Sequence, residues 1–139
     1  MDYKQEIINK IRDMSKYYSG HQVFRDWIEV YALAIANACE PEGTVVWNKR
    51  EQQYLNTISK YQTAEVDGFA ELGGLLTLAL EKDMSDILGS VYMGIGTGNK
   101  ATGQFFTPDS VSQLTAKMMD VEIVSIKEPI RLHEPTCGS

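Results

Sequence analysis

Apolar residues at helical spacing run through residues 2–93 and leave little room for a β fold. In 2–18 and 21–39 they recur three or four positions apart, as on one face of an α-helix. Breaks at Ser19-Gly20 and at Pro41 to Gly43 are typical of helix ends. The predicted inward faces are Ile7, Ile8, Ile11 and Met14 in the first helix, and Val23, Trp27, Val30, Tyr31, Ala34, Ile35 and Ala38 in the second.

Three more helices are expected before the sequence becomes rich in glycine at residue 94. One spans 48–61, with Asn48 as its N-cap, and another is capped by Thr63 and runs to about Lys82. A short fifth helix covers 84–93. The inward residues are predicted to be Tyr54, Leu55 and Ile58, then Phe69, Leu72, Leu75, Leu76, Ala79 and Leu80, then Ile87, Leu88, Val91 and Tyr92. Residues 1–95 therefore form a predicted helical bundle that we expect to fold by itself.

A glycine-rich segment, 94–103, marks the boundary of this bundle. It is a poor phosphate-binding loop, because no strand is predicted before it and no serine or threonine comes directly after Lys100. After it we predict a helix over 107–119 and a short strand over 129–133.

The overall charge and the rare residue types exclude several classes of function. A net charge of −6 without a basic cluster argues against this segment forming the main nucleic-acid-binding surface. Cys39 and Cys137, like His21 and His133, lack the spacing of a metal site. No secretory leader and no membrane-length apolar run is present, so we expect a cytoplasmic protein with reduced thiols and no membrane contact.

Two short motifs near the end of the chain carry the functional information. Gly103-Gln104-Phe105-Phe106-Thr107-Pro108 leads into the predicted helix, with Thr107 as N-cap and Pro108 at the first helical position. Phe106 and Val111 have the spacing of a hydrophobic staple. Such a helix start favours an anionic group, although an ordinary capped helix has the same pattern. Val111, Leu114 and Met118 are predicted to dock this helix on the bundle.

The second motif, Glu134-Pro135-Thr136-Cys137-Gly138-Ser139, follows the predicted strand. A glycine in the turn after the first strand of a βαβ unit allows a ligand to approach the backbone, although a surface turn also fits. Cys137 is interpreted as a small packing residue in this turn.

In this order, the two motifs resemble the N-6 adenine DNA methyltransferases, most closely the modification subunit of type I restriction systems. The resemblance covers roughly residues 103–139. It implies a mainly α chain, with a helical domain over 1–95 and the start of a truncated Rossmann-like methyltransferase domain over 96–139. It also implies S-adenosylmethionine as cofactor, DNA as substrate, and specificity and restriction subunits as possible partners. The cofactor residues that it implies are Gln104, Phe105, Phe106, Thr107 and Pro108, with Glu134, Pro135, Thr136, Cys137 and Gly138.

The chain departs from that family in what it lacks. The catalytic Asn-Pro-Pro-aromatic motif and the acidic residue that binds the ribose are absent from these 139 residues. We therefore expect an N-terminal fragment that is inactive alone, whose strand at 129–133 is exposed, irregular or paired with a second copy. A helical protein–protein interaction module without catalytic activity is the alternative interpretation.

Overall fold

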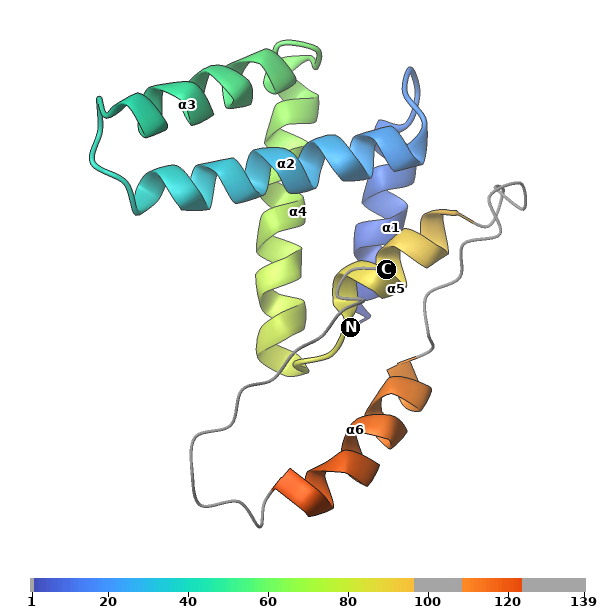
Figure 1. Cartoon of the computed structure of the whole chain (residues 1–139). Coiled ribbons are helices and arrows are strands. Elements are labelled where there is room, and N and C mark those ends of the chain that lie inside the picture. Colours follow the sequence, from blue (N-terminus) through green and yellow to red (C-terminus); the bar gives the residue numbers. More distant parts are fainter. Residues whose placement is uncertain (1, 97–108, 124–139) are drawn as a thin grey trace. The chain divides into compact units, whose positions relative to one another are not determined.

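The computed structural model describes residues 2–96 and 109–123, and the described part is built from α-helices (Figure 1). These are α1 (Tyr3–Met14), α2 (Gly20–Ala38), α3 (Val45–Ile58), α4 (Thr63–Lys82), α5 (Ile87–Ile95) and α6 (Asp109–Ile123). No strand occurs among the described residues, and the mainly α class predicted from the sequence is confirmed. The predicted strand over 129–133 lies outside them. The chain divides into two compact units, Met1–Lys100 and Ala101–Ser139.

Short polar side chains begin most helices of the first unit. The side chains of Asp2, Ser19 and Thr44 each accept a hydrogen bond from a backbone N–H three residues on, at 3.2, 3.2 and 3.1 Å. Asp86 does the same for α5, accepting from the Gly89 N–H at 2.8 Å. These bonds satisfy backbone donors that would otherwise lack a partner at a helix start.

Two of the predicted N-caps are wrong. The third helix begins at Val45, because Thr44 caps it four residues before Asn48. The fourth helix is preceded by Gln62, whose backbone N–H donates to the Glu65 carboxylate at 2.9 Å, so Thr63 is already inside the helix. In both cases the chain offers two polar candidates within a few residues, and the earlier one begins the helix.

Trp27 lies at the centre of the core of the first unit. Its side chain is 0% exposed, and buried aliphatic residues from α1, α2, α4 and α5 surround it. The buried apolar residues are Ile7, Ile8, Ile11, Met14, Val23, Trp27, Val30, Tyr61, Phe69, Leu72, Leu76, Ala79, Ile87 and Val91. The helical spacing predicted most of this set correctly for α1, for the first half of α2 and for α4.

Glycines in α4 allow two neighbouring helices to approach closely. A Cβ atom added at Gly73 would lie 2.8 Å from the Tyr31 ring of α2, and one at Gly68 would lie 2.9 Å from the Met14 sulfur of α1. The glycines therefore do not interrupt α4. They remove the bulk that would separate it from α1 and α2.

The first helix is also fixed to the two helices that come last in this unit. Lys10 forms an ion pair with Glu71 of α4. The Arg12 guanidinium donates to the backbone carbonyl of Gly94, in α5, at 3.1 Å. A Cβ atom at Gly94 would lie 2.5 Å from Ile8, so α5 also depends on a glycine at its contact with α1.

The second half of α2 and all of α3 form a hairpin that extends past α4 (Figure 1). α3 packs mainly on α2, and Thr57 is its one buried residue. Consequently, several residues that we predicted to face inward are exposed. They are Ala34, Ile35, Ala38, Leu55 and Leu80. Their spacing is right for a helix face, but no other helix of the first unit covers these residues.

We predict that Trp27→Ala lowers the free energy of unfolding by roughly 3–5 kcal/mol, because it leaves a large cavity in a closed core. Chemical denaturation followed by circular dichroism measures this change. Val45→Ala is the control, since Val45 is 86% exposed, and it should change stability by less than about 0.5 kcal/mol. Similar losses for the two variants would contradict the central position of Trp27.

Candidate functional site

The residues predicted to bind the cofactor lie outside the described part of the chain. This holds for Gln104, Phe105, Phe106, Thr107 and Pro108, and for Glu134, Pro135, Thr136, Cys137 and Gly138. The predicted helix after the first motif is present as α6, whose first residue is Asp109. Along α6, Val111, Leu114 and Met118 are exposed. The docking of these three residues on the bundle stays a prediction.

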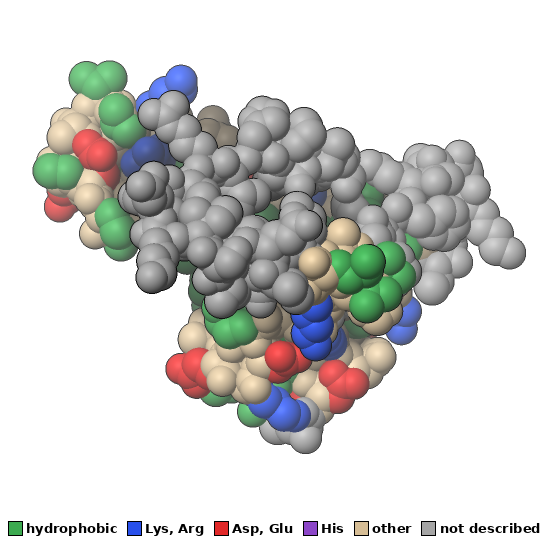
Figure 2. Space-filling view, turned by 60° about the horizontal axis from the view of Figure 1, so that its bottom comes forward, with side chains coloured by type: hydrophobic (Ala, Val, Ile, Leu, Met, Phe, Trp, Pro, Cys, Tyr) green, Lys and Arg blue, Asp and Glu red, His purple; other side chains and the backbone are tan. Residues whose placement is uncertain are grey.

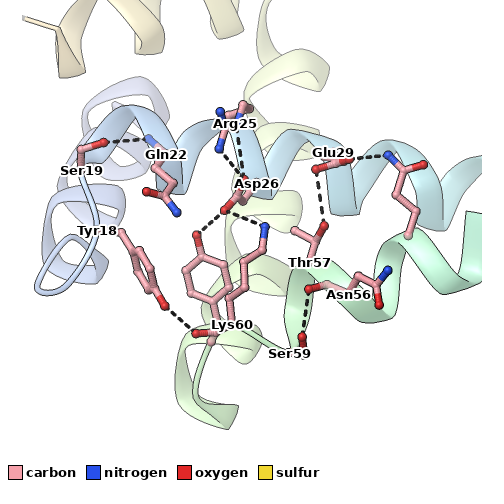
Figure 3. Close-up of polar contacts among 12 residues, drawn as sticks. Tyr18, Ser19, Gln22, Arg25, Asp26, Glu29, Asn56, Thr57, Ser59 and Lys60 are labelled. Carbon is pink, nitrogen blue, oxygen red and sulfur yellow. Dashed lines mark hydrogen bonds and ion pairs between the residues drawn. The ribbon is translucent and has the colours of Figure 1, made fainter.

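Within the first unit, the most unusual polar group is the carboxylate of Asp26 (Figure 3). It lies on α2 next to Trp27 and is only 1% exposed. The Tyr61 hydroxyl, from the connection between α3 and α4, donates to its Oδ2 atom at 2.8 Å. Burying a carboxylate is costly unless it is paired and hydrogen-bonded, so this arrangement needs its partners.

Two cations and a second tyrosine complete this polar cluster. The Arg25 Nε lies 3.4 Å from Asp26 Oδ1, and the Lys60 Nζ lies 3.9 Å from Oδ2. The Tyr18 hydroxyl donates to the Lys60 carbonyl at 2.7 Å, and its ring lies 4.9 Å from that of Tyr61. The cluster thus links α2 with two connecting segments. One joins α1 to α2, and the other joins α3 to α4.

The Tyr61 hydroxyl is held in its neutral form. Burial, and then the hydrogen bond to Asp26, raise the pKa of Tyr61 above its ordinary value. The phenol therefore acts as a hydrogen-bond donor at neutral pH and is a poor general base. Because the Asp26 carboxylate is closed off from solvent, we interpret the cluster as structural.

A shallow hollow of about 520 Å³ lies at the start of α2. It is lined by Ser19, His21, Gln22, Phe24, Arg25, Ile28 and Tyr92. The rings of His21 and Phe24 lie 5.0 and 5.7 Å from that of Tyr92, so its floor is aromatic. The His21 Nδ1 atom is buried and has no hydrogen-bond partner in the described structure. The hollow offers contact area to a ligand, and its one serine, Ser19, already caps α2 by accepting a hydrogen bond from the Gln22 N–H at 3.2 Å.

Neither a cluster of metal ligands nor a membrane-length apolar helix occurs among the described residues. Among the described residues, no group of three or more His, Cys, Asp or Glu side chains could hold a metal ion. On the face drawn in Figure 2, the basic and acidic side chains of those residues are interspersed. None of the helices described is both long and apolar enough to cross a bilayer.

Sequence reasoning missed the cluster around Asp26 and the aromatic hollow. One signal was available for the first, since Asp26 falls at helical spacing between Val23 and Val30, on the apolar stripe of α2. Its partners, Tyr61 and Lys60, are 34 or more positions away, and the periodicity of a single helix cannot identify them.

Comparison with known proteins adds no relative. No family model matches the chain, and no curated protein and no solved structure matches it significantly.

We predict that Asp26→Ala destabilises the protein by roughly 2–4 kcal/mol, because Tyr61 and the two cations lose their common acceptor. Tyr61→Phe should cost about 1–2 kcal/mol, the effect of leaving a buried acceptor with one donor fewer. The matched control is Asp67→Ala, since Asp67 is exposed on α4. Denaturation curves and a double-mutant cycle measure the coupling between Asp26 and Tyr61. Additive losses would show that the two residues do not act together.

A second prediction concerns alkaline pH. Because the pKa of Tyr61 is raised in the folded state, its contribution to stability is complete below the unfolded pKa of about 10. That contribution is lost as the pH rises through the folded value. Urea denaturation between pH 8 and 11 should show a steeper loss of stability for the native chain than for Tyr61→Phe. Parallel pH profiles for the two proteins would count against the assignment.

Proposed function

We propose that this chain is the N-terminal part of a DNA adenine N-6 methyltransferase of the restriction-modification type. Such an enzyme transfers a methyl group from S-adenosylmethionine to the N6 atom of adenine in DNA. One observation carries the proposal, namely the order of the two motifs, Gly103 to Pro108 and Glu134 to Ser139, within 37 residues. Either motif alone is a common turn or helix start.

The structure is consistent with this proposal in two respects. A unit of helices precedes the motifs, and the family carries a helical domain at that position. A helix, α6, begins directly after Pro108 and provides the N-terminus toward which the first motif leads. Free N–H groups at such a terminus favour a carboxylate by about 0.3–1 kcal/mol. The methionine end of the cofactor carries a carboxylate of this kind.

The two motifs would have different tasks in cofactor binding. Gln104, Phe105, Phe106, Thr107 and Pro108 would cover the methionine end of S-adenosylmethionine. The turn from Glu134 to Gly138 would lie beneath the cofactor, where a residue without a side chain allows close approach. Methyl transfer itself would depend on an Asn-Pro-Pro-aromatic motif, which these residues do not include. That motif holds an adenine that has been flipped out of the duplex.

The charge of the chain limits the share of this part in DNA binding. With a net charge of −6, it is poorly suited to neutralise phosphates, so the main DNA grip would belong to other regions or to a specificity subunit. The helical unit would then serve chiefly as a contact module within the enzyme. We place the enzyme in the cytoplasm, where DNA and S-adenosylmethionine are available to it.

The test is cofactor binding and methyl transfer by the full-length product of the gene. We expect calorimetric binding of S-adenosylmethionine, and transfer of its labelled methyl group to N6 of adenine in duplex DNA. Phe106→Ala should weaken binding by at least about tenfold, the effect of losing a buried aromatic contact. Val45→Asp, in the helical unit, is the matched control and should leave binding unchanged. The 139-residue chain alone should bind weakly or not at all.

Two results would refute the proposal. One is a full-length product that neither binds S-adenosylmethionine nor continues with a glycine after Ser139 and a downstream Asn-Pro-Pro-aromatic motif. The other is a bound structure in which residues 104–108 lie far from the cofactor.

A further inference from the structure

The hairpin formed by α2 and α3 extends past α4 (Figure 1), and both α2 and α4 have exposed apolar residues near this crossing. The apolar stripe of α2 is buried at Val23, Trp27 and Val30, and it continues on the same face beyond the crossing. There Ala34 and Ala38 are exposed, and Ile35 is 51% exposed. The apolar stripe of α2 is therefore longer than the part that the core buries. Exposed apolar patches of this kind often mark contacts with other molecules.

α4 also has exposed residues next to the positions where it contacts α2. The crossing is fixed by the close contact of Gly73 with Tyr31 and by the 3.4 Å approach of the Tyr31 and Thr77 hydroxyls. Gly74, next in the chain, is exposed, and a Cβ atom added there would meet nothing within 4 Å. Leu78 is one turn further on and is also exposed. We define the corner surface as Ala34, Ile35, Ala38, Gly74 and Leu78.

The size of these residues indicates what shape the corner surface accepts. Three of the five are alanine or glycine, which let the backbone of a second element come close. Ile35 on α2 and Leu78 on α4 provide larger apolar side chains. An added helix with an apolar stripe suits the corner surface, because it can contact α2 and α4 together.

The charge around the corner surface selects among possible occupants. α4 contains four acidic residues and one basic residue, Lys82, at its last position. Asp67 and Glu81 lie seven positions before and after Gly74, on the same side of the helix, and both are exposed. A second copy of the chain would bring the same acidic side and a net charge of −6 to the contact. Like charges oppose the association of two copies. A partner with basic side chains beside its apolar stripe would instead be attracted to this surface.

We propose that the corner surface is a docking site for an amphipathic helix of a partner protein, with lysine or arginine flanking its apolar stripe. The apolar stripe packs against Ile35 and Leu78, and the basic flanks face Asp67 and Glu81. This inference concerns the helical unit alone and does not depend on the proposed methyltransferase activity.

The test uses two labelled synthetic peptides of about five helical turns. Both carry the same leucine and alanine stripe, flanked by lysine in one and by glutamate in the other. Fluorescence anisotropy with the 139-residue chain, at about 150 mM salt, measures their binding. We expect the lysine peptide to bind at least about tenfold more tightly than the glutamate peptide. This preference alone could reflect net charge, so variants must locate the binding.

Three variants locate it. Ile35→Asp should weaken binding of the lysine peptide by at least about tenfold, as loss of an interface anchor does. The control is Val45→Asp, which makes the same kind of change at the exposed tip of the hairpin and should leave binding unaltered. Gly74→Gln should also weaken binding, because the added side chain keeps the backbone of a docked helix away from α4. It should raise the melting temperature at the same time, since glycine is unfavourable inside a helix. A loss of binding in this variant cannot come from unfolding.

Equal affinities for the native chain, Ile35→Asp and Gly74→Gln would overturn the proposal, and so would an equal loss in Val45→Asp. A concentration-dependent dimer that Ile35→Asp abolishes, seen by sedimentation, would also overturn it, because the surface would then belong to a second copy. None of these assays includes S-adenosylmethionine or DNA, so their failure is distinct from failure of the proposed function.

Discussion

The burial of Trp27 is the interaction on which the helical unit depends. Its indole is fully buried in a core to which α1, α2, α4 and α5 all contribute side chains. The glycines of α4 then determine how near the helices come. Gly73 accepts the Tyr31 ring of α2, and Gly68 accepts Met14 of α1. One large residue and two minimal ones therefore set the geometry of the bundle.

The residue next to Trp27 imposes a different kind of constraint. Asp26 places a carboxylate on the buried side of α2, between Val23 and Val30, which costs free energy that an apolar residue would not. In return, its carboxylate accepts a hydrogen bond of defined length and direction from Tyr61. Apolar packing tolerates sliding, whereas a buried hydrogen bond to a carboxylate does not. The cluster thereby fixes the connection between α3 and α4 against α2, and with it the direction of the α3 hairpin.

Sequence reasoning succeeded where one helix contains all the information. The stripes of α1 and α4, the short α5 and the helix after the first motif follow from spacing and breakers alone. It failed at Ala34, Ile35, Ala38, Leu55 and Leu80, because spacing shows which face is apolar but not whether another helix covers it. Asp26 and Tyr61 escaped notice for a related reason, since their contact joins positions 35 apart in the chain. The residues predicted to bind the cofactor rest on a resemblance, which the helical unit does not test.

The contacts of α1 have a consequence for the order in which the protein can fold during synthesis. α1 leaves the ribosome before the other helices of this unit, but two of its partners, Glu71 in α4 and Gly94 in α5, emerge about 60 to 80 residues later. Until then α2 is the one native partner of α1 that has been made, so Ile7, Ile8 and Ile11 are incompletely covered. The α2–α3 hairpin, whose two helices are adjacent in the chain, can form earlier because it closes a short loop. We therefore expect the nascent chain to be most prone to aggregation just before residue 95 appears, and a chaperone to act in that interval.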